Sequence, residues 1–354
     1  MAVQPPPDET APSPVPDQMT AAVVDAPGAS PRVCPVDVPA RKPGFTLLQV
    51  LAAPVNPLDL LIASGSFHSV RYELPYVPGS ECAGVVLASD RYAPGTLVYA
   101  EPHASPESPG AFSTHVVVPD EDVLVLPDGV TPAEAAAVGN SGTAAYLPLI
   151  EIAGLRAGET VLILGASGAV GQLAVQIARR HGAGRVVGVG RDQPALDRLL
   201  ELGADAVVAL DAGGGSGDLP RRLSAAAAPV DIVLDGLYGV PLLAALPACA
   251  ARARVVNIGN LAGPVAQLPA GLLRGKQLTV TGFAGLLIPL REKRAGLEWL
   301  WAGLARGELR IDIRTFSLDE LPAAWTAQAA SPHAKCVVLP HGGQPRPSRL
   351  TTPE

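Results

Sequence analysis

Residues 160–171 read Thr-Val-Leu-Ile-Leu-Gly-Ala-Ser-Gly-Ala-Val-Gly, and this stretch decides the fold. An apolar run, 160–164, leads into a turn of small residues, and a helical pattern follows over 168–181. Small residues let the backbone approach a pyrophosphate closely, and a helix N-terminus presents free N–H groups to it. The context predicts a dinucleotide-binding turn, although Ser167 replaces the second glycine of the usual pattern. A tight strand-to-helix turn without a ligand is the alternative.

The same rhythm continues along the middle third of the chain. Short, nearly continuous apolar runs alternate with Ala- and Leu-rich helical patterns such as 194–202. Parallel strands covered on both faces have this pattern. The runs predict an α/β Rossmann domain with a doubly wound parallel sheet. The predicted strands are 160–166, 185–191, 206–210, 231–237, 254–260 and 277–283.

The regions on either side of this middle third have a different sequence pattern. Between residues 19 and 126, short strands are interrupted by Pro and Gly, which predicts an irregular β-barrel or sandwich. A helical stretch, 290–306, and a final strand, 335–339, follow the predicted sheet. We expect the final strand to return to the first domain, so that the nucleotide domain is an insertion and the cleft between the domains is the natural site.

Composition excludes several classes of protein. The net charge of −7 and the lack of any Lys/Arg-rich run argue against nucleic-acid binding. No apolar run is long enough to span a bilayer, so we expect no membrane segment. Four widely spaced cysteines predict reduced thiols in a cytoplasmic protein. The polar termini, 1–18 and 341–354, are predicted to be disordered tails, and the first lacks the pattern of a signal peptide.

The end of the second predicted strand indicates which dinucleotide binds. An NAD site needs a carboxylate there for the ribose 2′-hydroxyl, whereas this chain has Gly190 and Arg191. An arginine can pair with the 2′-phosphate of NADPH. The sequence therefore favours NADPH over NADH, although Asp192 stands next to Arg191 and an ordinary solvated arginine is the alternative.

Further motifs surround the glycine-rich turn in a fixed order: Asn-Pro-Leu-Asp at 56–59, Leu-Pro-Tyr-Val-Pro-Gly-Ser-Glu at 74–81, Gly-Thr-Ala-Ala-Tyr at 142–146 and Arg-Gly-Lys at 274–276. From residue 19 to 340 the chain resembles the quinone oxidoreductase branch of the medium-chain dehydrogenase/reductase family. The resemblance implies a GroES-like β-rich catalytic domain, 19–139 and 284–340, with an inserted Rossmann NADP(H)-binding domain, 140–283. It also implies a homodimer, which we expect to pair through the edge strand 277–283.

The chain departs from the zinc-dependent relatives at the positions of their metal ligands. Those relatives have Cys, His and Cys where this chain has Asn56, Ser80 and Gly139, none of which supplies a thiolate or imidazole. We therefore expect no metal site. Without a Lewis acid, the chemistry that remains is hydride transfer to an acceptor that is already electrophilic: an enone, an enoyl thioester or a quinone.

Two lines of reasoning predict the cofactor-binding residues. The glycine-rich turn and the end of the second strand supply the residues expected around the phosphates. The resemblance supplies the residues expected around the nicotinamide. Leu237 and Lys335 are added because their segments are expected to face the cleft or the adenosine phosphate. The full set is Asn56, Thr143, Ser167, Gly168, Ala169, Val170, Gly190, Arg191, Leu237, Ile258, Gly259, Asn260, Phe283 and Lys335.

The catalytic proton donor is not identified by the sequence. Related enoyl reductases often carry a tyrosine where this chain has Phe67, which cannot donate a proton. Candidate substitutes are Tyr72, Tyr76, Tyr146 and His68, and packing alone also accounts for each.

The leading interpretation is an NADPH-dependent reductase of a conjugated carbonyl. A quinone reductase is the alternative within the class. Phe67 tilts the choice towards quinones, which need no carbon protonation, or towards an enone whose enolate is protonated by water. An NADPH-binding sensor or structural protein without turnover is the alternative of another class. Asp59 is expected to orient the loop at Asn56 by hydrogen bonds, and not to act as an acid.

Overall fold

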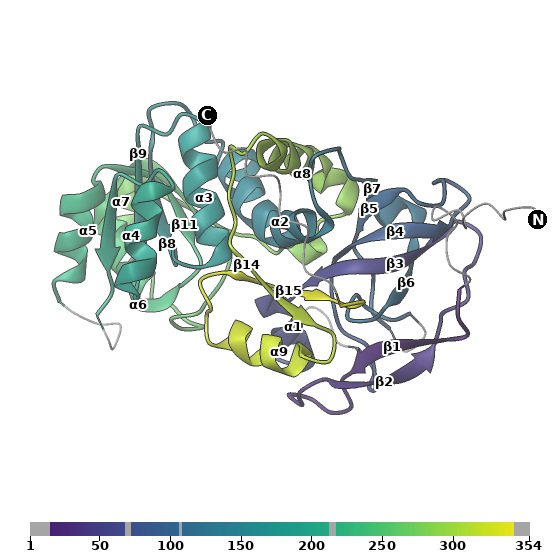
Figure 1. Cartoon of the computed structure of the whole chain (residues 1–354). Helices are drawn as coiled ribbons and strands as arrows, with labels where there is room; N and C mark the ends of the chain where they lie inside the picture. Colours follow the sequence, from purple (N-terminus) through teal and green to yellow (C-terminus); the bar gives the residue numbers. More distant parts are fainter. Residues whose placement is uncertain (1–14, 68–71, 106–107, 212–216, 343–354) are drawn as a thin grey trace, which may run out of the picture. The chain divides into compact units, whose positions relative to one another are not determined.

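The computed structural model of this chain describes residues 15–67, 72–105, 108–211 and 217–342. Contacts between residues divide it into two units. The first unit contains the residues up to Ala137, Ile313–Ala330 and those from Cys336 onward, and the second contains Val138–Asp312 and Ser331–Lys335. Figure 1 shows the path of the chain.

The second unit is built on six parallel strands in the order β10-β9-β8-β11-β12-β13. The order reverses direction at β8, which is the arrangement of a doubly wound Rossmann sheet. The predicted α/β class and the parallel sheet are therefore confirmed. The strands are β8 (Thr160–Leu164), β9 (Arg185–Gly190), β10 (Ala206–Ala209), β11 (Val230–Asp235), β12 (Cys249–Asn257) and β13 (Thr279–Gly282).

Helices connect these strands and cover the sheet (Figure 1). Helix α3 packs on β8 and β9, α4 on β9 and β10, and α7 on β12. The helices of this part of the chain are α2 (Pro132–Tyr146), the π-helical η2 (Leu147–Ile152), α3 (Ala169–Arg180), α4 (Gln193–Glu201), α5 (Leu219–Ala227), α6 (Gly239–Ala245), α7 (Ala270–Lys276) and α8 (Leu290–Ala305), with short 3₁₀ turns η3 (Leu246–Ala248) and η4 (Gly285–Leu287).

Helix α8 lies in the second unit, whereas the sequence assigned residues 284–340 to the catalytic domain. The reason is its packing on α2. A Cβ added at Gly142 would lie 2.6 Å from Leu300 Cδ1. The rings of Tyr146 and Trp299 are 5.3 Å apart. In the division by contacts, the second unit therefore extends past α8 to Asp312.

The first unit is rich in antiparallel strands. Strands β1 (Gln18–Val23) and β2 (Arg32–Asp37) pair with each other, and a larger sheet has the order β14-β15-β3-β4-β5-β7 with β6 paired to β3. The larger sheet contains β3 (Phe45–Pro54), β4 (Cys82–Ala88), β5 (Leu97–Ala100), β6 (His115–Pro119), β7 (Val123–Val125), β14 (Ile313–Ser317) and β15 (Lys335–Leu339). Helices α1 (Pro57–Ala63) and α9 (Leu321–Ala329) and the 3₁₀ turn η1 (Asp120–Asp122) complete the unit.

The last strand returns to this sheet as predicted, because Val337 pairs with Pro54 in antiparallel register. The predicted tail 1–18 is shorter than expected, since β1 already begins at Gln18. Most of both predicted tails, 1–14 and 343–354, lies outside the described residues. None of the helices in the described ranges is long and apolar enough to cross a membrane.

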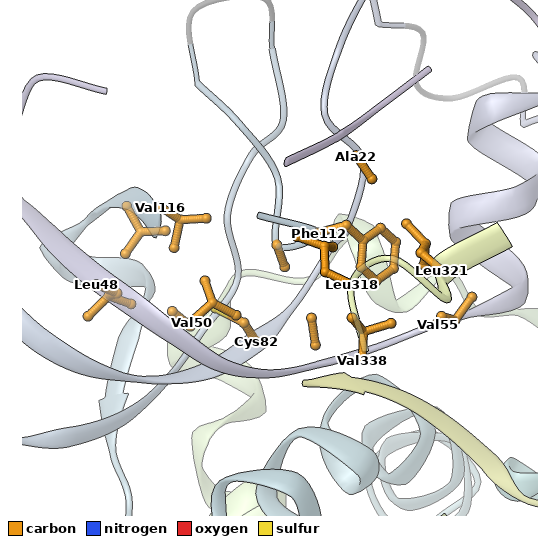
Figure 2. Packing of buried hydrophobic residues seen from close by; sticks show 14 of the residues in the cluster. Ala22, Leu48, Val50, Val55, Cys82, Phe112, Val116, Leu318, Leu321 and Val338 are labelled. Atoms are coloured by element: carbon orange, nitrogen blue, oxygen red, sulfur yellow. The ribbon is translucent and has the colours of Figure 1, made fainter. Parts of the chain in front are cut away.

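The core of the first unit is a cluster that joins the sheet to α9 (Figure 2). Phe112 is a fully buried aromatic member of this cluster, together with Val50, Val55 and Leu321. Its ring meets Trp325 edge to face, with 6.1 Å between centroids. Such aromatic pairs add to the free energy gained by burial alone.

The substitution Phe112→Ala removes this ring and leaves a cavity. We expect the free energy of unfolding to fall by about 3–5 kcal/mol, as for other buried aromatic residues. Urea unfolding measures the loss. Leu61→Ala is the control, because Leu61 is 41 % exposed on α1 and its truncation should change stability little. Equal losses in the two variants would contradict the assigned core.

Candidate functional site

The glycine-rich turn joins β8 to α3 through unusually close backbone contacts. Gly165 has φ of +86°, a conformation that favours glycine. The N–H groups of Gly165 and Ala166 both donate to Val189 O, at 2.9 and 2.8 Å. A Cβ at Gly171 would lie 2.4 Å from Ala166 Cα. Only glycine at position 171 therefore lets α3 start so close to the turn.

Helix α3 begins immediately after this turn. Its N-cap residue is Gly168, and in the described part of the chain no side chain caps the helix. The first N–H groups of a helix lack partners within it and favour an anion. The predicted residues 167–170 therefore form a turn and the start of a helix, and their contact with a pyrophosphate stays a prediction.

The next strand brings Gly190 and Arg191 beside the turn. A Cβ at Gly190 would lie 3.1 Å from Ser167 Oγ. Arg191 is exposed, and its guanidinium has no hydrogen-bond or ion-pair partner among the residues that the structure describes. Asp192 is occupied locally, because its Oδ1 accepts the N–H of Ala195 at 2.8 Å as the N-cap of α4.

Asp235 organises the loop after β11. It is fully buried, and its Oδ1 accepts the N–H groups of Leu237 and Tyr238 at 3.0 and 2.8 Å. Its Oδ2 accepts Asn257 Nδ2 at 2.9 Å. Burial raises the pKa of the carboxyl, although these hydrogen bonds oppose the shift. The loop holds Leu237 beside the glycine-rich turn, since a Cβ at Gly165 would lie 3.3 Å from Leu237 Cδ2.

The remaining predicted residues of the sheet lie at the same edge. The N–H of Ile258 donates to the last residue of β11 at 2.8 Å, and that of Phe283 to the last residue of β12 at 2.9 Å. A Cβ at Gly259 would lie 2.9 Å from Gly236 O. Asn260 follows and is exposed. The structure thus brings the predicted residues together at the carboxyl ends of the strands, where open α/β sheets bind ligands.

A segment far along the chain supports the turn, and the sequence did not indicate it. Gln172 Nε2 donates to the carbonyl oxygens of Ser167 and His333, each at 2.8 Å. His333 Nδ1 lies 3.2 Å from Ser167 O, and His333 has φ of +55°. No local pattern reveals a contact between residues so distant in sequence.

Two predicted cofactor residues make contacts within the second unit. Lys335 is buried, and its Nζ donates to Ser141 Oγ at 2.9 Å. Thr143 is buried on the same helix, α2, and its Oγ1 donates to Gly139 O at 2.9 Å. A role for either residue in cofactor binding stays a prediction.

In the first unit, Asn56 belongs to a buried polar cluster. Its N–H donates to Asp59 Oδ2 at 2.8 Å, and the N–H of Ser80 donates to Asp59 Oδ1 at 3.1 Å. The predicted orienting role of Asp59 is therefore confirmed. Asn56 Nδ2 donates to Glu81 Oε1 at 2.8 Å, and Tyr99 Oη donates to Glu81 Oε2 at 2.7 Å. The sequence did not indicate Tyr99.

The described residues contain no group of three or more His, Cys, Asp or Glu side chains that could hold a metal ion. Asn56, Ser80 and Glu81 form a network in which the amide of Asn56 donates hydrogen bonds to the Ser80 hydroxyl and the Glu81 carboxylate.

The candidate proton donors lie in different units of the structure or outside the described residues. Tyr146 packs against the rings of His181 and Trp299 in the second unit, and burial raises the pKa of its phenol. Tyr72 and Tyr76 are neighbours in the first unit, with 5.0 Å between ring centroids. His68 lies outside the described residues.

The close contact at Gly171 can be tested directly. Gly171→Ala places a Cβ against backbone atoms that cannot move away independently, so we expect a loss of about 1–3 kcal/mol in the free energy of unfolding. Gly271→Ala is a matched control, because no atom lies within 4 Å of the added Cβ. Urea unfolding of the two variants gives the comparison, and equal stability would contradict the contact.

Comparisons with known proteins agree with this fold. The family model of the alcohol dehydrogenase GroES-like domain matches residues 42–128, and that of the zinc-binding dehydrogenase matches residues 169–301. The quinone oxidoreductase of Sus scrofa is 30% identical over 279 residues, which cover 78% of this chain and 82% of that protein.

Two further relatives are informative. The structure of the quinone oxidoreductase from Thermus thermophilus, also solved with NADPH, is 31% identical with a TM-score of 0.74, and the match covers 91% of this chain and 100% of that one. The phthioceranic/hydroxyphthioceranic acid synthase of Mycobacterium tuberculosis is 35% identical over 220 residues, which cover 62% of this chain but 10% of the synthase. The chain therefore belongs to the medium-chain dehydrogenase/reductase family, in its quinone oxidoreductase-like branch, and is an oxidoreductase.

Proposed function

We propose that this protein is an NADPH-dependent reductase that transfers hydride to a conjugated carbonyl acceptor, an enone or enoyl thioester, without zinc. The observation that carries the proposal is the glycine-rich turn with an unpartnered arginine beside it, at the carboxyl edge of a Rossmann sheet, among the residues that the structure describes. The family relationship supplies the reaction class.

The preference for NADPH rests on Arg191. Its guanidinium is exposed at the end of β9, next to Gly190 and the turn. In the same place Asp192 already accepts a hydrogen bond from α4, which reduces its availability to a ribose hydroxyl. A guanidinium binds phosphate through charge-assisted hydrogen bonds. The solved relative that binds NADPH supports the same choice.

The residues present suit an acceptor that needs no Lewis acid. When bound, NADPH supplies the hydride. The protein's task is then to orient the acceptor and exclude competing reactions. Asn56, held by Asp59 and Glu81, presents a fixed amide at the position where zinc-dependent relatives have a metal ligand.

A quinone acceptor is the second candidate, and Phe67 favours it. An enone reduced at its β-carbon needs a proton on the α-carbon, and phenylalanine cannot supply one. Quinone oxygens take protons from water. The named activity of the Sus scrofa relative also supports a quinone, whereas the match to the phthioceranic acid synthase supports an enoyl thioester.

The proposal includes a homodimer in the cytoplasm. Strand β13 is an edge of the six-stranded sheet, and Thr279 and Val280 on it are exposed. Edge strands present unpaired backbone groups to a second copy. The four cysteines are free in the structure, which suits a reducing compartment.

Arg191→Gln tests the cofactor preference. We expect the Kd for NADPH to rise roughly tenfold, because a charge-assisted hydrogen bond to the 2′-phosphate is lost, while the Kd for NADH stays unchanged. Fluorescence titration with both nucleotides measures it. Arg221→Gln is the control, since Arg221 is also exposed but lies on α5, where it pairs with Asp218. Equal weakening of NADPH and NADH binding would contradict a 2′-phosphate contact.

Turnover tests the reaction class. The wild-type protein is expected to oxidise NADPH with at least one acceptor from a panel of quinones, enones and enoyl thioesters, monitored by the absorbance of NADPH. The acceptor class with the highest kcat/KM identifies the substrate class. Tight NADPH binding without turnover on any acceptor would favour a sensor or structural protein, and absence of NADPH binding would refute the proposal.

A further inference from the structure

A small pocket in the first unit lies next to the Asn56 cluster. It is formed between α1 and the segment that leads to β4, and we call it the Tyr76 pocket. Its lining residues are Asp59, Ile62, Tyr72, Tyr76, Pro78, Gly79, Ser80 and Ala104. The cavity offers about 10 Å³ to the centre of a water molecule, which is space for one oxygen-sized group.

Tyr76 is the exceptional residue of this pocket. Its side chain is 4% exposed, and its hydroxyl has no hydrogen-bond partner among the residues that the structure describes. An unsatisfied buried hydroxyl is costly, and such groups are rare in folded proteins. Tyr76 is also held in place, because its backbone exchanges hydrogen bonds with Val24 at 2.9 and 3.2 Å. The backbone position of this tyrosine is therefore fixed.

The surroundings of this hydroxyl keep it a donor. Burial raises the pKa of the Tyr76 phenol, and the nearby negative charge of Asp59 raises it further. Asp59 directs one oxygen to each of the N–H groups of Asn56 and Ser80. A group that enters the pocket consequently meets a protonated phenol, and an acceptor oxygen without a proton of its own is the complementary partner.

The pocket adjoins one of the residues predicted from the sequence, Asn56. Ser80 and Tyr72, which line the pocket, are partly exposed. Ser80 Oγ lies 3.4 Å from Asn56 Nδ2, so the pocket adjoins the residue predicted to approach the nicotinamide. An oxygen bound beside Tyr76 thus lies close to the Asn56 cluster of the same unit.

We propose that Tyr76 is a substrate-binding residue whose hydroxyl donates a hydrogen bond to the carbonyl oxygen of the acceptor. The inference rests on the proposed function and deepens it. During quinone reduction, hydride brings two electrons and one proton, negative charge develops on oxygen, and water supplies the second proton. Tyr76 keeps its own proton, and its hydrogen bond strengthens as the charge develops.

Tyr76→Phe removes only the hydroxyl and keeps the ring. With NADPH and 1,4-benzoquinone we expect kcat to fall roughly tenfold, with a smaller change in KM, because the bond matters most in the transition state. The thermal unfolding midpoint should stay the same or rise, since the lost hydroxyl has no partner among the described residues of the free protein. A merely structural tyrosine would instead lower the midpoint and leave kcat unchanged.

Tyr92→Phe is the matched control in the same unit. The hydroxyl of Tyr92 donates to backbone oxygens of Asp120 and Val123, 3.2 and 3.1 Å away. Its removal should lower the unfolding midpoint without affecting kcat. A loss of kcat without a loss of stability in Tyr76→Phe, and the reverse in Tyr92→Phe, separates a substrate contact from a structural one.

A spectroscopic measurement tests the contact without turnover. With NADP⁺ bound no hydride is available, so 1,4-benzoquinone can be held in the complex and its carbonyl stretch recorded by isotope-edited infrared difference spectroscopy. A hydrogen bond lowers this frequency, and we expect the band to move to higher frequency in Tyr76→Phe. If the wild type turns over and Tyr76→Phe has the same kcat and the same carbonyl frequency, the role of Tyr76 is overturned while the proposed function stands. A wild type without turnover on any acceptor overturns the proposed function, and the role of Tyr76 falls with it.

Discussion

The approach of helix α3 to the backbone at Ala166 is the constraint on which the nucleotide half of the molecule depends. With Gly171 in place, the helix starts directly behind the turn, and the turn is fixed to β9 through Val189. A larger residue would push the helix N-terminus away from the strand edge. The backbone geometry that we propose for anion binding is therefore a consequence of packing and does not require a charged side chain.

The carboxyl edge of the sheet is stabilised by buried hydrogen bonds that span neighbouring strands. Asp235 at the end of β11 accepts Asn257 Nδ2 from the end of β12 and also fixes the loop that carries Leu237. Gln172 joins the turn to His333 in the same way. A buried polar group is costly unless it is paired, so these bonds specify one arrangement of the loops around the proposed cofactor site.

Much of the fold follows from local sequence, because buried parallel strands are continuous apolar runs. Strand β12 begins five residues before the predicted start, at Cys249 instead of 254, because Arg252 interrupts the apolar pattern and adopts φ of +64°. The packing of α8 on α2 depends on the fit of Leu300 against Gly142, and the hydrophobic pattern of the sequence does not reveal this contact. In the site, the turn and Arg191 could be predicted from motifs, whereas the contacts of Gln172, His333 and Tyr99 could not, since each joins residues through tertiary structure alone.

In the first unit, buried polar groups with hydrogen-bond partners have a structural role, whereas a buried group without a partner among the described residues is available to a ligand. Asp59 and Glu81 are buried, and each accepts hydrogen bonds from fixed donors, so they hold Asn56 and Ser80 in place. A ligand gains little by competing for oxygens that are already engaged. Tyr76 differs, because folding removes its hydroxyl from water and no described group offsets the free-energy cost with a hydrogen bond. An acceptor oxygen placed there would recover that free energy on binding, which makes the hydroxyl a better site for recognition than any of the well-paired carboxylates around it.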